Sequence, residues 1–590
     1  MFTPGSILLH DTLTPGGTSL LFAAPIRVLT AHDAAGVRTA LAQLEAAQQA
    51  GLWAAGYLAY EAGLVFEERL APLLPARSDT PLLWFGLYAA PQRLDAATVA
   101  HYLADLVGTH TGRAVDIVPS HTLAQYQSAF DQVKSLITAG HTYQVNLTFA
   151  ADFRLEGDPL ALYADLVRQQ PVAHGALLNT GEHWILSRSP ELFVARKGDG
   201  LSARPMKGTR RRGRSIAEDA QGRAGLAADP KNRAENLMIT DLLRNDLGRI
   251  AQIGSVAVTD LFTVETYRTL HTLTSGITAT ARPGIGTAAL LENLFPCGSI
   301  TGAPKLRAME IIQAAEAGPR GVYTGSIGHI APNGDLAFNV AIRTAVIDAQ
   351  GAGRIGIGGG IVADSTAEDE YREALLKMAF FTDPPDPVTL IETLLWTPDA
   401  GYALRQRHLD RLAASAAYFD LPCNLAAIGG LLDAQAFAAP MRVRLTLDAG
   451  GPALTAVPLP PNPAMFRFAL ADTRLDSQSL WLAHKTTNRG FYDAPRQRAQ
   501  AAHSVDEVVF LNERGELTEG SITNLFVEQG GMLLTPPLAC GLLPGTLRAE
   551  LIATGRAEEQ VLTLADLEAA GAVWLGNSVR GLLPAQWVRL

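Results

Sequence analysis

The sequence predicts two α+β domains in succession: a first domain with large antiparallel sheets flanked by helices, and a second, two-lobed domain. Three observations support this prediction. Short segments of alternating apolar and polar residues recur through roughly the first 380 residues and are joined by short turns. Two amphipathic stretches, residues 124–139 and 231–249, predict helices among these strands. Three prolines within residues 382–387 exclude a helix there and predict a linker between domains at residues 1–381 and 388–590.

The clearest strand patterns of the first domain are four short alternating segments, residues 51–60, 184–188, 325–330 and 338–347. The pattern G-x-G-x-x-G occupies residues 351–356 and matches dinucleotide-binding loops. Such a loop must open a helix, whereas the next residues, Ile-Gly-Gly-Gly-Ile-Val, are typical of a strand, so we expect a hairpin turn. In the second domain, the proline-rich residues 458–463 predict a hinge between two lobes.

The composition disfavours several classes of protein. The net charge of −10 argues against a nucleic-acid binder, and we expect the one basic run, residues 210–214, to form a solvated loop. The amino terminus lacks a charged segment followed by an apolar one, and no stretch reaches about 18 apolar residues, so we expect neither a secretory signal nor a membrane span. Three widely spaced cysteines indicate reduced thiols in a cytoplasmic protein rather than disulfides or a zinc site. They are Cys297, Cys423 and Cys540.

Lysine is scarce, because only seven of the 48 basic residues are lysine and the rest are arginine. Arginine replaces lysine as a surface charge, but its guanidinium does not deprotonate and cannot act as an amine nucleophile. Lysines in glycine- or threonine-rich surroundings are therefore candidates for chemistry, namely Lys207, Lys305 and Lys485. The remaining four lie in polar, helix-like or turn-like contexts and are expected to be surface charges: Lys134, Lys197, Lys231 and Lys377.

Three carboxylates are candidates for holding a metal ion. Glu370 and Glu373 are three residues apart on a predicted helix, which the S-x-x-E pattern beginning at Ser365 is expected to cap. Glu235 lies on the second amphipathic helix. Carboxylates from two helices can hold Mg²⁺, which keeps waters and also accepts substrate oxygens. The alternative for each glutamate is an exposed helix face.

Seven motifs follow one another between residues 140 and 361. They are Gly-His-Thr-Tyr-Gln-Val-Asn-Leu at residues 140–147, Ser-Arg-Ser-Pro-Glu-Leu-Phe at 187–193, Pro-Met-Lys-Gly-Thr at 205–209, the helix at 234–249, Gly-Ser-Ile-Thr-Gly-Ala-Pro-Lys at 298–305, Phe-Asn-Val-Ala-Ile-Arg-Thr at 338–344, and Gly-Gly-Gly-Ile at 358–361. In these motifs and their order, the chain resembles the chorismate-utilising enzymes over about residues 50–380. The resemblance is greatest to the aminodeoxychorismate synthase component I group.

The resemblance implies a particular reaction. Members that add water carry a lysine at the position of Gln144, so ammonia is the expected nucleophile. Anthranilate synthases carry alanine at the position of Lys207, so aminodeoxychorismate is the expected product. Lys207 would attack C2 of chorismate as the C4 hydroxyl leaves, ammonia would then add at C4 and displace the lysine, and Glu191 would be the general acid and base. A neutral Lys207 requires burial or a nearby positive charge.

The resemblance also implies the surrounding contacts. Mg²⁺ would be held by Glu235 and Glu373 with Glu370 close by. The guanidinium of Arg343 suits a substrate carboxylate, since it meets both oxygens at once. His271 matches an active-site histidine of the family. The implied substrate contacts are Arg343, Tyr323, Thr209, Thr301, Gly358, Gly359 and Gly360.

Four segments of the second domain carry a second resemblance: residues 407–412, 484–489, 519–525 and 545–548. In these segments, about residues 388–590 resemble the fold-type-IV enzymes that use pyridoxal 5′-phosphate (PLP), a group with branched-chain and D-amino-acid aminotransferases and aminodeoxychorismate lyase. By this resemblance Lys485 forms the covalent link to PLP and then shuttles protons, while Glu519 contacts the pyridine nitrogen. The expected phosphate contacts are Arg411, Thr546, Leu547, Asn577 and Ser578.

The two resemblances together predict a bifunctional enzyme of 4-aminobenzoate synthesis for folate. The first domain would make 4-amino-4-deoxychorismate, and the second would eliminate pyruvate from it as a lyase. Two alternatives stay open: an anthranilate-type synthase joined to an unrelated aminotransferase, and a C-terminal half that is a non-catalytic dimerisation scaffold. No Gly-x-Cys-x-Gly nucleophile turn is present, so ammonia is expected from a separate glutamine amidotransferase subunit. A homodimer through the PLP domain is expected by analogy.

Overall fold

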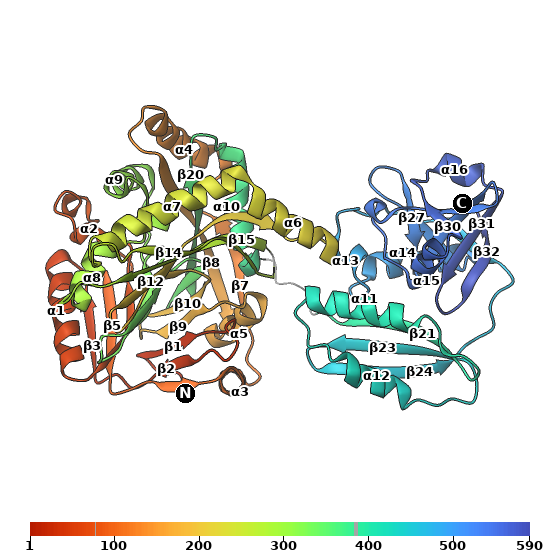
Figure 1. Ribbon diagram of the computed structural model, residues 1–590, viewed down its shortest axis with the longest axis horizontal. Helices are drawn as coiled ribbons and strands as arrows, with labels where there is room; N and C mark the ends of the chain where they lie inside the picture. Colours follow the sequence, from red (N-terminus) through yellow and green to blue (C-terminus); the bar gives the residue numbers. More distant parts are fainter. Residues whose placement is uncertain (77, 269, 383–387, 590) are drawn as a thin grey trace. The chain divides into compact units, whose positions relative to one another are not determined.

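The computed structural model describes residues 1–76, 78–268, 270–382 and 388–589 (Figure 1). Beyond Thr382, the predicted linker lies outside these described residues. The chain forms two compact units. The first unit comprises Met1–Arg211 and the chain from Arg223 up to the proline-rich segment, and the second comprises Arg212–Gly222 and the chain after that segment.

The first unit contains two ten-stranded antiparallel sheets. In order across the first sheet, the strands are β16 (Gly302–Ala303), β8 (Gln144–Gly157), β20 (Ala352–Ile361), β19 (Thr344–Asp348), β10 (His183–Ser189), β9 (His174–Asn179), β1 (Ser6–His10), β2 (Ser19–Phe22) and β6 (Gln92–Leu94), with β7 (Gly112–Pro119) beside β8. In the second they are β13 (Met206–Arg211), β15 (Leu270–Thr280), β12 (Gly200–Arg204), β11 (Leu192–Lys197), β18 (Leu336–Asn339), β17 (Ser326–Ile330), β4 (Trp53–Leu58), β5 (Leu83–Tyr88) and β3 (Arg27–Ala31), with β14 (Ala257–Thr266) beside β15.

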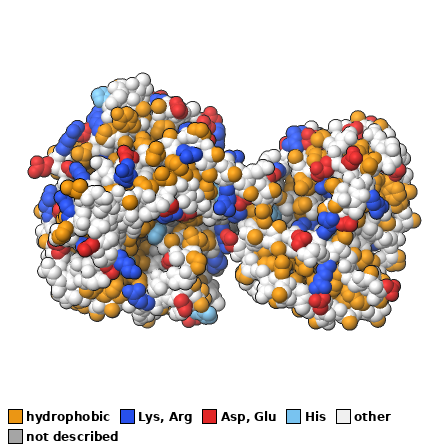
Figure 2. Space-filling model, in the orientation of Figure 1, with side chains coloured by type: hydrophobic (Ala, Val, Ile, Leu, Met, Phe, Trp, Pro, Cys, Tyr) orange, Lys and Arg blue, Asp and Glu red, His pale blue; other side chains and the backbone are white. Residues whose placement is uncertain are grey.

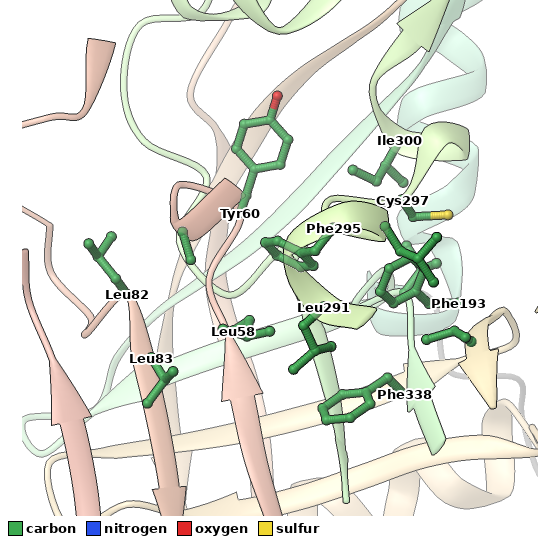
Figure 3. Packing of buried hydrophobic residues seen from close by; sticks show 14 of the residues in the cluster. Leu58, Tyr60, Leu82, Leu83, Phe193, Leu291, Phe295, Cys297, Ile300 and Phe338 are labelled. Atoms are coloured by element: carbon green, nitrogen blue, oxygen red, sulfur yellow. The ribbon is translucent and has the colours of Figure 1, made fainter. Parts of the chain in front are cut away.

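Helices cover these sheets and bury their apolar faces. The main ones are α1 (Ala34–Gln49), α3 (Ala96–Val107), α4 (Leu123–Thr138), α5 (Pro159–Gln169), α6 (Ile216–Ala228), α7 (Pro230–Gly248), α8 (Thr287–Leu294), α9 (Lys305–Ala315) and α10 (Ala367–Thr382). Figure 3 shows Leu291 of α8 among side chains from strands, including Leu58 and Phe338. The Phe193 and Phe295 rings meet edge to face, with centroids 6.1 Å apart, in the same cluster.

Both predicted helices of the first domain are confirmed within one or two residues. Thr122 and Gln125 form a capping box at the start of α4, which buries Tyr126 and Phe130 one turn apart. Asp229 caps α7, which has Pro230 at its first position. The predicted hairpin is also confirmed, since Gly351 adopts a positive φ of 82° in the turn that joins the antiparallel strands β19 and β20.

The predicted cap at Ser365 is wrong. The hydroxyl of Ser365 donates to the carboxylate of Glu370 at 2.7 Å, and Thr366 accepts the hydrogen bond from the backbone N–H of Asp369 instead. A bond to a charged carboxylate is stronger than one to a backbone amide, which accounts for the shift of the cap by one residue.

The predicted single segment at residues 338–347 is also wrong, because it contributes to two different sheets. Strand β18 ends at Asn339 in one sheet, and β19 begins at Thr344 in the other. Arg343 lies between them with a φ of +51°, in the left-handed region. The alternating pattern continues on both sides of this bend, so periodicity alone could not reveal it.

The basic run is not a solvated loop as predicted. Arg210 and Arg211 belong to strand β13. Arg212 and Arg214 pair with acidic residues that follow them, Asp219 and Glu218 respectively. These acids lie in α6, a few residues further on, so the chain folds back on itself locally.

The second unit contains two sheets. The four-stranded sheet has the order β22 (Gly401–Tyr402), β21 (Leu390–Thr397), β23 (Met441–Asp448) and β24 (Gly451–Pro458). The eight-stranded sheet has the order β27 (Leu517–Gly520), β26 (Glu507–Leu511), β25 (Phe466–Leu470), β32 (Gly581–Trp587), β31 (Ala572–Asn577), β28 (Asn524–Gln529), β29 (Met532–Thr535) and β30 (Ala557–Glu559). The α-helices of the second unit after the proline-rich segment are α11 (Arg405–Tyr418), α12 (Leu425–Asp433), α13 (Leu480–Ala483), α14 (Gly490–His503), α15 (Thr546–Ala553) and α16 (Leu564–Glu568). The proline-rich residues 458–463 connect the two sheets.

The surface carries charges of both signs. Figure 2 shows acidic and basic side chains interspersed over the visible face of each unit. Within the described residues, no helix is both long enough and apolar enough to cross a membrane. Cys297 and Cys540 are buried, and Cys423 is partly buried.

Candidate active sites

The first unit contains a cavity of about 340 Å³. Strands β13 and β20 and helices α7 and α10 contribute side chains to its wall. Ten of the residues predicted from the sequence line this cavity: Glu191, Lys207, Thr209, Glu235, Tyr323, Arg343, Gly358, Gly360, Glu370 and Glu373. These residues come from positions spread over almost 200 residues of chain, so the fold brings the predicted motifs together at one place.

The amine of Lys207 and the carboxyl of Glu191 are prepared for proton transfer. Burial lowers the pKa of Lys207, and the positive charge of Lys377 lowers it further. Burial raises the pKa of Glu191 from 4.5 to about 7, although Ser299 donates a hydrogen bond to it. Among the described residues, Oε1 of Glu191 has no hydrogen-bond partner. Glu191 can therefore hold or release a proton near neutral pH, and Lys207 more easily becomes a neutral nucleophile.

We expect Glu191→Gln to stabilise the protein at pH 8 and to change its stability little at pH 5. With a pKa raised to about 7, native Glu191 keeps a proton that the unfolded chain has already released above pH 4.5. Native stability therefore falls as the pH rises from 4.5 through 7, by up to about 3 kcal/mol. Glutamine carries no charge and removes this loss. Thermal unfolding midpoints at both pH values measure the effect, with the exposed Asp105→Asn as control. An equal change at pH 5 and pH 8 would contradict the expectation.

The side-chain amide of Gln144 lies close to Lys207 because Gly360 has no side chain. A Cβ atom placed on Gly360 would lie 2.1 Å from Nε2 of Gln144 and 3.0 Å from Nζ of Lys207. The amide and the amine therefore approach the backbone of Gly360 from the same side, where only glycine leaves room. Gln144 is thus placed beside Lys207, although it does not itself line the cavity wall.

Arg343 presents a guanidinium nitrogen without a hydrogen-bond partner to the cavity. Its Nη1 has none among the described residues, and burial lowers the pKa of Arg343 to about 10. The guanidinium lies 5.8 Å from the ring centroid of Tyr267, and an incoming carboxylate would supply the hydrogen bond that Nη1 lacks. Tyr323 closes another part of the wall, where its ring packs so tightly on Gly356 that a Cβ there would lie 2.1 Å from it.

The three candidate metal ligands lie on the same wall of the cavity. Burial raises the pKa of Glu235 and of Glu370, and the charge of Glu373 adds to both shifts. Glu373 itself pairs with Lys377 at 2.9 Å, which lowers its pKa. Within the described ranges, no three carboxylate, imidazole or thiol groups converge in an arrangement that could hold a metal. Crowded carboxylates from two helices still fit Mg²⁺, which needs only one or two of them together with substrate oxygens.

Four predicted residues do not line the cavity: Gln144, His271, Thr301 and Gly359. His271 lies on β15 between Leu270 and Thr272, which do line it, and neighbouring side chains of a strand point to opposite faces. Its Nδ1 lies 3.0 Å from the hydroxyl of Thr266. The hydroxyl of Thr301 donates to backbone carbonyls of the preceding turn. His271 and Thr301 therefore lie next to the residues that line the cavity and can support them, but neither side chain lines the cavity itself.

The lysines also depart from the sequence prediction. Lys231 and Lys377 line the cavity and are not surface charges as predicted. The four-residue spacing of Lys377 from Glu373 was the available signal, because it places both on one helix face. Lys305 instead pairs with Asp246 at 2.6 Å and donates to the carbonyl of Leu294 at 3.0 Å, outside the cavity wall.

The second unit contains a larger cavity of about 610 Å³. All seven residues predicted as PLP contacts line it: Arg411, Lys485, Glu519, Thr546, Leu547, Asn577 and Ser578. Burial lowers the pKa of Lys485 to about 8, and the charge of Arg411 contributes. An amine with this pKa is partly neutral at physiological pH, as attack on a carbonyl requires.

Glu519 is held by three hydrogen-bond donors. Its carboxylate accepts hydrogen bonds from the hydroxyl of Tyr492, the backbone N–H of Leu543 at 2.7 Å and the side-chain amide of Asn524 at 3.0 Å. Burial nevertheless raises the pKa of Glu519 to about 7. A fixed, buried carboxyl group of this kind suits the protonated nitrogen of a pyridine ring, whose charge would favour its ionised form.

A buried ion-pair network supports Arg411 in the cavity wall. Arg411 donates to Glu392 through Nε at 2.9 Å and Nη2 at 2.6 Å. His408 joins Glu392 at 2.6 Å to the hydroxyl of Ser578 at 2.9 Å. Burial alone would raise the pKa of Glu392, but Arg411 and His408 lower it to about 2. Beside this network, α15 begins at Thr546, so backbone N–H groups at its first turn are available to an anion such as phosphate.

Two arginines of this cavity were missed from the sequence. Arg442 and Arg444 alternate with buried residues along β23, so both side chains project from the face that lines the cavity. Neither forms an ion pair within the part of the chain that the structure describes. The alternation in Met-Arg-Val-Arg-Leu-Thr-Leu-Asp was the signal that could have revealed them.

Comparisons with known proteins agree with both halves. Residues 13–383 match the chorismate binding enzyme family, and residues 389–587 match amino-transferase class IV. The chain belongs to the chorismate binding enzyme family, with a class IV amino-transferase region after it. The α+β fold class predicted from the sequence, with large antiparallel sheets, is thereby confirmed.

Three individual proteins are similar to parts of this chain. Aminodeoxychorismate synthase of Streptomyces pristinaespiralis is 43% identical over 265 residues, covering 45% of this chain and 37% of that protein. Aminodeoxychorismate synthase component 1 of Bacillus subtilis (strain 168) is 38% identical over 252 residues, covering 43% and 53%. The crystal structure of anthranilate synthase component I from Streptococcus pneumoniae TIGR4 superposes with a TM-score of 0.55 at 26% identity, covering 63% of this chain and 93% of that one. The chain thus spans about half or less of the length of these two curated relatives.

Proposed function

We propose that this protein makes 4-aminobenzoate in two steps. The first unit converts chorismate and ammonia to 4-amino-4-deoxychorismate, and the second eliminates pyruvate from that intermediate. The observation that carries the proposal is the buried Lys207 beside Glu191 and Gln144, in a cavity of a chorismate binding enzyme. The relatives named aminodeoxychorismate synthase support the same product.

In the first step the residues of the cavity have separate chemical roles. Nζ of Lys207 forms a bond to C2 of chorismate while the C4–O bond breaks, and Glu191 gives its proton to the departing hydroxyl, which leaves as water. Ammonia then forms the C4–N bond as the C2–N bond to Lys207 breaks, and the ionised Glu191 takes up the surplus proton. Arg343 binds one substrate carboxylate. Glu235 and Glu370, with Glu373, would hold Mg²⁺, which would neutralise a substrate carboxylate.

In the second step PLP, when bound, supplies the electron sink for the elimination. Lys485 moves the proton, since its pKa of about 8 allows both charge states near neutral pH. Glu519 would hold the pyridine nitrogen, while the first turn of α15 together with Asn577 and Ser578 would receive the phosphate. The carboxyl oxygens of Glu392 keep Arg411 in the cavity wall.

Arg442 and Arg444 favour the lyase over an aminotransferase of apolar amino acids. 4-Amino-4-deoxychorismate carries two carboxylates, and two unpaired guanidinium groups on one wall match that charge. An aminotransferase acting on branched-chain substrates would instead need an apolar wall there. This charge and the fusion to the first unit point to the same intermediate.

We expect Arg442→Ala and Arg444→Ala each to raise the KM of the second step for 4-amino-4-deoxychorismate about tenfold, with a smaller effect on kcat. Each variant removes one charged contact to a substrate carboxylate but leaves Lys485 and Glu519 in place. Steady-state kinetics with the purified intermediate measure both constants. Arg467→Ala, which lies outside the cavity wall, is the control. Unchanged KM values in both variants would remove the charge argument for the lyase.

The proposal extends to partners. Ammonia would come from a separate glutamine amidotransferase subunit or from solution, and two copies of the chain would associate through the second unit. Size measurement in solution tests the dimer. Co-purification with a glutamine amidotransferase tests the source of ammonia.

The decisive experiment supplies purified protein with chorismate, Mg²⁺, an ammonium salt and PLP and follows the products by mass. Formation of 4-aminobenzoate and pyruvate would support both steps. Anthranilate instead would overturn the assignment of Lys207. Accumulation of 4-amino-4-deoxychorismate alone would keep the first step and exclude the lyase.

A further inference from the structure

The segment Arg212–Gly222 packs within the second unit, although the chain on both sides of it belongs to the first. It follows β13 directly, so it begins five residues after Lys207. We call these eleven residues the docking arm. Asp219 and Gly222 of the docking arm are buried, and Arg212 and Arg214 make the contacts described below.

Arg212 anchors the docking arm. Its guanidinium pairs with Asp219 at 2.8 Å, and the two side chains are only 8% and 10% exposed. It also lies 4.2 Å above the ring of Tyr418 and donates to the backbone carbonyl of Tyr418 at 3.1 Å. A Cβ on Gly213 would lie 2.3 Å from the backbone nitrogen of Asp219, so the tight turn requires glycine.

Arg214 connects the docking arm to His484. The backbone carbonyl of Arg214 accepts a hydrogen bond from Nε2 of His484 at 2.7 Å. A carbonyl can only accept, so Nε2 carries a proton, and in the neutral ring Nδ1 accepts from the hydroxyl of Ser415 at 2.9 Å. Burial lowers the pKa of His484 to about 4, which agrees with this neutral form. The imidazole also packs on Tyr418, with ring centroids 4.6 Å apart.

His484 immediately precedes Lys485, the lysine proposed to bind PLP. On the other side, the backbone carbonyl of Lys485 accepts a hydrogen bond from the N–H of Ile391 at 2.8 Å. The backbone that carries Lys485 is therefore held between β21 and the docking arm. Both His484 and Lys485 line the cavity, but the two ring nitrogens of His484 are engaged with the carbonyl of Arg214 and the hydroxyl of Ser415, so His484 can act through the docking arm without bonding a ligand.

We propose that the docking arm positions Lys485 through His484, so that the PLP site of the second unit depends on residues supplied from within the chorismate-binding region. His484 and Arg212 are positioning residues in this account. The inference rests on the proposed function only in taking Lys485 as the PLP lysine. It does not depend on which reaction the second unit catalyses.

The test measures PLP affinity of the full chain by absorbance titration after removal of bound cofactor. We expect Arg212→Ala and His484→Leu to weaken PLP binding about tenfold or more. His484→Gln, whose amide can still donate to the carbonyl of Arg214, should bind nearly as well as the original protein. Arg211→Gln, one residue before the docking arm and exposed, is the matched control.

A second readout reports the state of the docking arm itself. Trypsin should cut after Arg214 faster in Arg212→Ala than in the original protein, in which the docking arm is held in place. Unchanged PLP affinity in Arg212→Ala, with the arm cleaved readily, would overturn the inference, as would equal affinities of His484→Leu and His484→Gln. Failure of the original protein to bind PLP would overturn the proposed function as well. Normal PLP binding without 4-aminobenzoate would affect the proposed function alone.

Discussion

Replacing Lys207 by alanine is expected to reduce ammonia-dependent consumption of chorismate by on the order of 10³-fold or more. Lys377, which also lines the cavity, cannot take its place by a simple shift, because it is engaged with Glu373 at 2.9 Å and with the carbonyl of Gly358 at 3.0 Å. Alanine also removes the amine with which Glu191 acts as general acid and base. Loss of chorismate, followed by mass or absorbance under saturating ammonium, measures the effect.

Two variants sharpen this test. Lys207→Arg keeps a positive charge but lacks a neutral amine at accessible pH, so it should be as inactive as Lys207→Ala. Lys197→Ala removes a lysine at the exposed end of β11 and should retain full activity. Amination at an undiminished rate in Lys207→Ala would exclude the covalent role. Anthranilate formation by that variant would show that Lys207 selects between the two products.

Replacing Lys485 by alanine should stop the pathway one step later. The variant is expected to accumulate 4-amino-4-deoxychorismate and to form 4-aminobenzoate more slowly by on the order of 10³-fold or more. The second unit can use no other lysine, because Lys485 is the only one in residues 388–590. Product masses after a fixed time distinguish a block at this step from a block at the first.

The single lysine also makes the cofactor link easy to locate. Borohydride reduction of PLP-treated protein should attach one pyridoxyl group to the peptide that contains Lys485, and none in Lys485→Ala. Lys485→Arg serves as the control for charge, since it cannot form the link. Covalent attachment elsewhere, or undiminished 4-aminobenzoate formation by Lys485→Ala, would contradict the assignment.

Much of both sites could be predicted from the sequence, since their residues lie in contiguous motifs. Lys207 and Glu191 are examples, as are Lys485 and Glu519, and all four line the cavities. Glycine-rich β20 could be predicted as a strand because the residues after its glycines lack a helix pattern. These features are local, and local chemistry is what a sequence displays most directly.

Other features depended on partners distant in the chain. Arg212 appeared to belong to a solvated basic run because its stacking partner, Tyr418, lies 206 residues further on. Lys377 was predicted to be a surface charge because the helix face that it occupies meets β20 only in the folded chain, where Lys377 donates to the carbonyl of Gly358. His271 matches a family motif but does not line the cavity, whereas its strand neighbours Leu270 and Thr272 do, and a motif alone does not show which face of a strand a side chain occupies.

The docking arm gives the polypeptide an unusual path. The chain passes from the first unit to the second after Arg211, returns after Gly222, and passes over again at the proline-rich segment. The chain therefore crosses between the units three times rather than once. Cutting the proline-rich segment would not yield two independent proteins, because eleven residues that belong to the second unit would remain in the N-terminal fragment. Any attempt to exchange one half for that of another enzyme must carry the arm with the second unit.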